Sequence, residues 1–169
     1  MQHRRLLIVG AGQYGHVVKE IAEFNADFEM VSFLDDSSDD AVGKIVEAER
    51  FVTQYSMAIV AIGNAEIRRQ LTMKLVEYGY EIATLIHPKA TISSSAKVGM
   101  GCVIEAGAVL NTASELCEGV FVSPGAVVNH NSTVGQYSHI DCNAVVEAGS
   151  NVPANIKLVS GSVFAKKLV

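Results

Sequence analysis

The sequence predicts two folds in one chain, a small α/β domain followed by a parallel β-helix. Three observations lead to this prediction. A glycine-rich motif near the amino terminus follows a short apolar run and precedes a helical pattern. Strand and helix patterns alternate up to Pro88, and beyond it aliphatic residues recur at every sixth position. We therefore expect one domain over residues 1–87 and a second over residues 88–169.

Residues 1–87 alternate between strand and helix patterns, which is typical of a parallel sheet covered by helices. Short apolar runs predict strands over residues 5–9, 28–34, 56–62 and 80–86. Helices are expected over residues 15–24 and 65–78. The second helix places four apolar residues on one face, namely Ile67, Leu71, Leu75 and Val76. The pattern over residues 37–55 is ambiguous.

A six-residue period replaces this alternation after Pro88. The apolar series runs Ile92, Val98, Ile104, Leu110, Leu116, Val122, Val128, Val134, Ile140, Val146, Val152, Leu158 and Phe164. Such a period is typical of a β-helix, in which three hexads form one triangular coil with the aliphatic residue inside. The alternative is a β-sandwich with coincidental spacing. Because stacked coils bury their faces only against neighbours, we expect the flat outer walls to pack together in a homotrimer.

Composition and charge exclude several classes of function. The net charge is −5 and basic residues occur at most in pairs, so no nucleic acid partner is expected. No apolar run reaches the roughly 18 residues that a membrane span needs. The amino terminus reads as a strand and not as a signal peptide. Three cysteines without a CxxC pair favour a reducing compartment, so we expect a cytoplasmic protein without a metal site.

The glycine-rich motif predicts a nucleotide site. Gly10, Gly12 and Gly15 lie between a strand and a helix, and Asp35 follows 20 residues after Gly15. Glycines let the backbone approach a phosphate, and the helix amino terminus offers N–H groups. NAD fits this motif, but a sheet of about four strands suits a single nucleotide, which favours a UDP-sugar. The alternative is a tight structural turn. Tyr14 either contacts the ligand or covers the loop.

Polar residues also follow the next two predicted strands, at the edge where open sheets bind ligands. Asp35 or Asp36 is expected to accept a hydrogen bond from a ribose hydroxyl or a uracil N–H, and a solvated turn is the alternative. Gly63 and Asn64 end the following strand. Arg68 lies one helical turn further on and is expected either to meet a pyrophosphate or to form a surface salt bridge.

The chain resembles the PglD/NeuD-type sugar acyltransferases, within the hexapeptide-repeat acyltransferase superfamily. The resemblance rests on residues 10–15, Asp35 with Asp36, residues 61–69, residues 85–88, and residues 128–140 with two histidines nine apart. It implies a Rossmann-like domain that holds a nucleotide sugar, followed by a left-handed β-helix. It also implies transfer of an acetyl group from acetyl-CoA to a sugar amine or hydroxyl, for surface glycans. CoA would lie in the groove between adjacent β-helices of the trimer.

The resemblance assigns roles to the histidines. His130 becomes the general base, because the acceptor must lose a proton as it attacks the thioester carbonyl. His139 lies on another face of the coil, so the two imidazoles would converge only across a subunit interface. The acetyl-CoA contacts implied by the resemblance are His139, Gly149 and Lys157. His3 and His16 are expected to be structural or solvated.

Two departures from the family pattern leave an alternative open. The family usually has Glu or Asp after the catalytic histidine, whereas this chain has Asn131, which can orient an imidazole but supplies no charge. Residues eighteen apart stack on adjacent coils, so we expect Glu147 to lie diagonal to His130 and to replace that carboxylate. The β-helix is also one to two coils shorter than the family pattern, and the closing motif over residues 161–166 lacks its proline. The alternative is a catalytically reduced protein that binds the nucleotide sugar without productive CoA binding.

Overall fold

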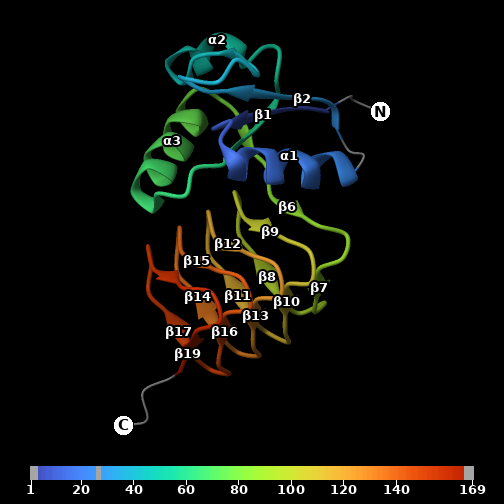
Figure 1. The fold of residues 1–169 in the computed structure, drawn as a ribbon, viewed down its shortest axis with the longest axis vertical. Coiled ribbons are helices and arrows are strands. Elements are labelled where there is room, and N and C mark those ends of the chain that lie inside the picture. Colours follow the sequence, from blue (N-terminus) through green and yellow to red (C-terminus); the bar gives the residue numbers. More distant parts are fainter. Residues whose placement is uncertain (1–3, 26–27, 166–169) are drawn as a thin grey trace. The chain divides into compact units, whose positions relative to one another are not determined.

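The computed structural model describes residues 4–25 and 28–165. They divide into two compact units, Met1–Leu85 and Ile86–Val169, which are described separately below (Figure 1). His3 and Lys166, on which expectations were stated above, lie outside the described residues. Within the described part of the chain, no helix has the length and apolar character that crossing a membrane requires.

The first unit is a five-stranded parallel sheet with helices packed against it. Its strands are β1 (Arg4–Val9), β2 (Phe28–Leu34), β3 (Ala41–Gly43), β4 (Met57–Val60) and β5 (Glu81–Ile82). Its helices are α1 (Gln13–Phe24), the 3-10 helix η1 (Ile45–Glu47), α2 (Ala48–Phe51) and α3 (Ala65–Glu77). Helix α1 contacts β1 and β2, and α3 contacts β4 and β5, so both helices cover apolar strands.

The strand order β3-β2-β1-β4-β5 places the nucleotide motif at the point where the order reverses. Strand β1 pairs with β2 on one side and with β4 on the other. Their carboxyl ends therefore meet at one edge of the sheet, which is where open α/β sheets bind ligands. The loops after β1, β2 and β4, together with the first turns of α1 and α3, contain all the residues that the sequence assigned to the nucleotide sugar.

Two expectations for this unit need correction. The strand expected over residues 80–86 is divided, because its last part forms β6 (Leu85–Ile86), which pairs with the β-helix. The apolar face of α3 is also different. Ile67 and Val76 are 46% and 48% exposed, whereas Arg68 and Leu75 are buried. The helix is rotated from the expected face because the guanidinium of Arg68 finds buried carbonyl partners, as described below.

The second unit is a parallel β-helix whose two-residue strands form three sheets (Figure 1). One sheet contains β7 (Thr91–Ile92), β10 (Val109–Leu110), β13 (Val127–Val128), β16 (Val145–Val146) and β19 (Val163–Phe164). The second contains β8 (Lys97–Val98), β11 (Glu115–Leu116), β14 (Thr133–Val134) and β17 (Asn151–Val152). The third contains β6, β9 (Val103–Ile104), β12 (Phe121–Val122), β15 (His139–Ile140) and β18 (Lys157–Leu158). Paired residues are eighteen apart from β7 onward, which is one coil of three hexads.

The expected hexad series forms the core of this unit. Its central members, from Ile104 to Val146, are at most 1% exposed, and together they make one continuous cluster. The turns between strands repeat with the same period, and the residues with positive φ are Gly101, Gly107, Ala113, Gly119, Gly125, Asn131, Tyr137, Asn143, Gly149, Asn155 and Gly161. Most of these positions carry Gly or Asn, the types that tolerate this conformation best, and Ala113 and Tyr137 are the exceptions.

Candidate active site

The three motif glycines have different surroundings. Gly10 has φ +105°, and a Cβ on Gly15 would lie 2.1 Å from the carbonyl oxygen of Gly10. These two positions are therefore closed to larger residues by the packing of the loop itself. A Cβ on Gly12 would meet no atom within 4 Å. Gly12 is thus the motif glycine that faces open space, as backbone that approaches a ligand must.

The amino terminus of α1 has the character of an anion site. Gly12 occupies its N-cap position, no side chain caps this end, and its first turn contains no acidic residue. The first N–H groups of a helix lack intrahelical partners and carry the positive end of the dipole. A phosphate would satisfy both at this end. Tyr14, in the same turn, is half-buried.

Asp35 holds the glycine loop to the end of β2. Its Oδ2 accepts from the N–H of Ala11 at 2.8 Å, and its Oδ1 accepts from the N–H groups of Ser37 and Ser38 at 2.8 and 3.0 Å. The bond from Ala11, followed by that from Ser37, lowers the pKa of the Asp35 carboxyl despite its partial burial. Asp36 accepts from the N–H of Ile45 at 3.0 Å. Both aspartates thus stabilise loop backbone, and contact with a nucleotide remains a prediction for each.

The loop after β4 is built by Asn64 and Arg68. The side chain of Asn64 caps α3 by accepting from the N–H of Ile67 at 3.0 Å. Arg68 is 1% exposed, and its guanidinium donates to the carbonyls of Ile62 and Gly63 at 2.7 and 3.1 Å. Arg68 therefore lies beneath the surface, where it satisfies carbonyls at a strand end, and a contact with pyrophosphate stays a prediction.

The loops after β1 and β4 lie side by side, because the N–H of Ala61 donates to the carbonyl of Val9 at 2.8 Å. A Cβ on Gly63, like one on Gly12, would meet no atom within 4 Å. The structure thus brings two open glycines of the predicted nucleotide site to the same edge of the sheet.

His130 is exposed at the turn that follows β13. Its N–H donates to the Oδ1 of Asn129 at 2.8 Å, which fixes the backbone of the turn. Its Nδ1 lies 3.0 Å from the Nδ2 of Asn131, the residue with φ 55°. The pair therefore forms a local unit in which an amide, in place of the expected carboxylate, contacts the imidazole.

Glu147 and Gly149 lie one coil below this turn. The backbone carbonyl of Glu147 accepts from the Oγ of Ser132 at 2.8 Å, while its carboxylate is exposed. Among the described residues, the Glu147 carboxylate makes no hydrogen bond to His130, whose N–H and Nδ1 contact Asn129 and Asn131. The N–H of Gly149 donates to the carbonyl of His130 at 3.0 Å, so Gly149 lies with the general-base candidate and apart from the other two predicted acetyl-CoA contacts.

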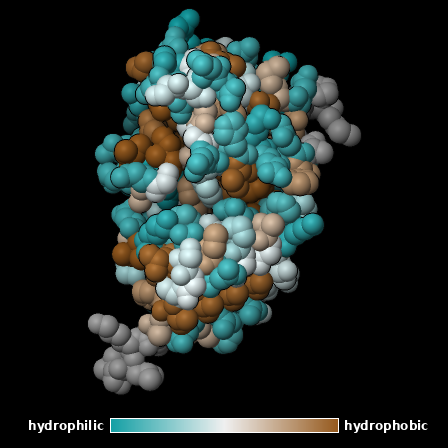
Figure 2. Space-filling view, viewed as in Figure 1, coloured by the Kyte–Doolittle hydropathy of each residue, from teal (hydrophilic) through white to brown (hydrophobic). Residues whose placement is uncertain are grey.

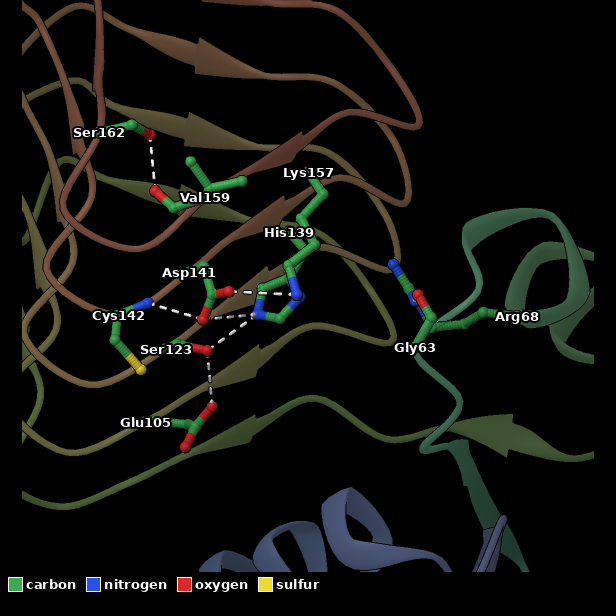
Figure 3. Close-up of polar contacts among 10 residues, drawn as sticks. All are labelled: Gly63, Arg68, Glu105, Ser123, His139, Asp141, Cys142, Lys157, Val159 and Ser162. Carbon is green, nitrogen blue, oxygen red and sulfur yellow. Dashed lines mark hydrogen bonds and ion pairs between the residues drawn. The ribbon is translucent and has the colours of Figure 1, made fainter.

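His139 lies in β15, on another sheet, and is part of a polar cluster (Figure 3). Its side chain is 15% exposed, and its Nε2 lies 2.8 Å from the Oγ of Ser123 and 4.0 Å from the Oδ1 of Asp141. The Oγ of Ser123 donates to the Oε1 of Glu105 at 3.1 Å. Lys157 is the register partner of His139 in the next coil, so the structure brings these two predicted residues together.

Asp141 connects the cluster to Lys157. It accepts from the N–H of Cys142 at 2.8 Å and lies 3.1 Å from the Nζ of Lys157. Burial raises the pKa of Asp141, but the Cys142 N–H, the Lys157 ammonium and His139 outweigh burial and leave the pKa below its usual value.

Sequence reasoning missed Glu105, Ser123 and Asp141, although a signal was present. The three residues are eighteen apart, and each follows an inward aliphatic residue of the hexad series. Among the described residues, no group of three or more His, Cys, Asp and Glu side chains is arranged to hold a metal ion.

The chain is similar to proteins of a known family along most of its length. Residues 5–75 match the model of the PglD N-terminal domain. The acetyltransferase domain of PglB from Neisseria gonorrhoeae FA1090 is 31% identical, with a TM-score of 0.84 over 96% of this chain and 92% of that one. The chain belongs to the PglD-type sugar acyltransferase family. The same Neisseria domain has also been solved in complex with acetyl coenzyme A, where it is 29% identical with a TM-score of 0.84 over 96% and 91% of the chains.

Two further proteins are similar to this PglD-type chain. The UDP-N-acetylbacillosamine N-acetyltransferase of Bacillus subtilis (strain 168) is 31% identical over 113 residues, which are 61% of this chain and 52% of that protein. The match therefore spans about half the length of this curated relative. The perosamine N-acetyltransferase of Caulobacter crescentus, solved with CoA and GDP-perosamine, shares the fold at 22% identity, with a TM-score of 0.83 over 96% and 89% of the chains.

Proposed function

We propose that this chain is an acetyl-CoA-dependent acetyltransferase that acylates the amine, or a hydroxyl, of a nucleotide-linked sugar in cytoplasmic steps of surface-glycan synthesis. The observation that carries the proposal is the exposed imidazole of His130, held by its own partner in a PglD-type chain. The Neisseria domain binds acetyl coenzyme A, which supports that co-substrate. The Bacillus relative is named for a UDP-sugar, which supports a UDP-amino-sugar as acceptor.

The edge of the α/β sheet supports the nucleotide-sugar site. The uncapped amino terminus of α1 suits a pyrophosphate, and Gly12 and Gly63 leave open space around it. Asp35 already accepts three backbone N–H groups, which weakens the comparison with NAD sites, where this carboxylate accepts from a ribose.

The chemistry requires a base at the acceptor nitrogen. As the amine attacks the thioester carbonyl, a C–N bond forms, the C–S bond breaks, and CoA leaves as the thiolate, which is then protonated. His130 removes the amine proton, and because its Nδ1 faces Asn131, the base is Nε2. Nε2 has a lone pair only when Nδ1 carries the proton, so the carbonyl of the Asn131 amide must face Nδ1 in the active form.

A homotrimer would supply the second half of this site. Four outward valines, Val109, Val127, Val145 and Val163, stack on one wall of the β-helix. Figure 2 shows a diagonal row of hydrophobic surface in the region where Figure 1 has β10, β13 and β16. Removing this stripe from water favours packing against neighbouring copies. Since His130 and His139 lie on different walls, we propose that a second copy brings its His139 and Lys157 to the CoA groove.

A thiol-release assay across UDP-amino-sugars tests the proposal. Mixing acetyl-CoA with the right acceptor is expected to release free CoA thiol, and His130→Ala is expected to slow release about 10²- to 10⁴-fold. Each ligand alone is expected to raise the melting temperature. A protein that is stabilised by the nucleotide sugar but not by acetyl-CoA would instead be the catalytically reduced binding protein, an alternative that the likenesses above do not support.

A further inference from the structure

Three residues on adjacent coils form a hydrogen-bonded chain that ends at His139 (Figure 3). Glu105 follows β9, Ser123 follows β12 and His139 lies in β15, so one sheet carries all three. Glu105 is 8% exposed and Ser123 is 4% exposed. A buried carboxylate requires donors, and the Ser123 hydroxyl supplies one at 3.1 Å.

The single proton of Ser123 determines which nitrogen of His139 is protonated. Because that proton is donated to Glu105, the Ser123 oxygen faces the imidazole with a lone pair. The Nε2 of His139 lies 2.8 Å from this oxygen and must therefore donate. The opposite tautomer would oppose two lone pairs at this distance, unless the hydroxyl turned away from a buried carboxylate.

The remaining groups around the ring are consistent with a protonated Nε2. The Oδ1 of Asp141 lies 4.0 Å from it and is a second negative atom on the same side. The Lys157 ammonium is paired with Asp141 at 3.1 Å. The ring of Phe121 packs edge-on against the imidazole, with centroids 6.0 Å apart. The Asp141 carboxylate thus faces Nε2, the Glu105 carboxylate acts on it through Ser123, and the ring contacts Phe121.

We propose that Glu105 and Ser123 are positioning residues that keep the proton of His139 on Nε2 and fix the plane of its ring. The inference rests on the proposed function for its consequence, in which the ordered imidazole contacts the acyl donor. Losing the chain of hydrogen bonds would then raise the KM for acetyl-CoA roughly ten- to a hundredfold, because a misplaced contact weakens donor positioning. The KM for the nucleotide sugar, whose proposed site is on the other unit, would be unchanged.

The test is long-range proton–nitrogen NMR of the full chain labelled with ¹⁵N-histidine, at alkaline pH where imidazoles are neutral. His139→Asn identifies the signals by removing them. The wild-type protein is expected to show Nε2 protonated and Nδ1 with a lone pair. Ser123→Ala and Glu105→Gln are expected to give a mixture of tautomers, whereas the matched control Glu115→Gln, an exposed glutamate on β11, keeps the wild-type pattern.

The spectra separate this inference from the proposed function. A wild-type ring with its lone pair on Nε2 would overturn the inference whether or not the protein transfers acetyl groups, and this result does not depend on the Ser123 and Glu105 variants. An unchanged tautomer in both folded variants would also overturn it. If the tautomers shift as expected but no acceptor yields free thiol, the positioning role of Glu105 and Ser123 is supported while the transferase assignment fails.

Discussion

Replacing Asn131 by aspartate is expected to increase acetyl transfer. The substitution places a carboxylate where the amide now lies 3.0 Å from the Nδ1 of His130. The backbone at this position has φ 55°, a conformation that aspartate tolerates nearly as well as asparagine. The carboxylate would accept from Nδ1–H and so enforce the tautomer that leaves the Nε2 lone pair free for the acceptor.

The size of the effect follows from the exposure of the pair. At 3.0 Å, opposite unit charges in bulk water attract by about 1.4 kcal/mol, which is roughly a tenfold change in rate. In serine proteases, replacing the buried aspartate beside the catalytic histidine by asparagine lowers kcat about 10⁴-fold. His130 and Asn131 are both exposed, so solvent screens their charges and the effect is smaller. We therefore expect kcat to rise about tenfold at low salt, and less at high salt.

Thiol release at saturating acetyl-CoA and UDP-amino-sugar measures this change. Asn155→Asp is the matched control, because Asn155 is exposed and has φ 60° at an equivalent turn outside the neighbourhood of His130. It adds the same charge to the same kind of turn and is expected to leave kcat unchanged. A rate for Asn131→Asp equal to or below that of wild type, or an equal gain in the control, would refute the assignment of Asn131 as the partner of the base.

Three further predictions test other parts of the structure. Gly12→Ala is expected to weaken binding of the UDP-sugar about tenfold or more without lowering the melting temperature. Gly15→Ala is expected to destabilise the fold, because its Cβ would lie 2.1 Å from a carbonyl oxygen. Calorimetric titration measures the first effect, and thermal unfolding measures the second. Asp35 has a lowered pKa through the N–H groups of Ala11 and Ser37, so its contribution to stability is full above about pH 4 and is lost as pH falls through the folded value; thermal unfolding of Asp35→Asn should therefore change less between neutral and acid pH than that of wild type. Val127→Asp places a charge in the middle of the valine stripe and should convert trimers to monomers in sedimentation velocity, and trimers that persist would contradict the assigned interface.

The β-helix could be predicted because its core residues repeat strictly, whereas the sheet that each strand joins could not be predicted. Every inward position from Ile104 to Val146 follows the six-residue period, since each coil must fill the same triangular section. The run ending at Leu85 and Ile86 reads as one strand, because periodicity reveals a strand but not the sheet it joins. Assigning Leu85 and Ile86 to the β-helix requires knowledge of strand pairing, which only the eighteen-residue register supplies.

Two features of the site differ from what sequence patterns indicate for one reason, which is that such patterns assume that polar side chains lie at the surface. Arg68 was expected at the rim, yet its guanidinium is buried because the carbonyls of Ile62 and Gly63 satisfy it. Glu105 and Ser123 were missed for the same reason. A carboxylate that follows a buried strand is interpreted as a surface residue until its hydrogen-bond partner one coil away is known. Spacing could have revealed this pair, but the contacts of Arg68 required the fold.

The identity of residue 131 is explained by the backbone before any appeal to lost catalysis. From Gly101 to Gly161, every sixth residue of the β-helix turns has positive φ, and Asn143 and Asn155 occupy such positions without a histidine before them. A glutamate would be strained there, so the turn favours glycine, asparagine and aspartate. Of these, asparagine is the neutral residue that can still accept from Nδ1–H of His130. The backbone of the turn therefore explains an asparagine after the base, provided that orienting the imidazole is enough for catalysis. Asn131 does not by itself indicate an inactive protein.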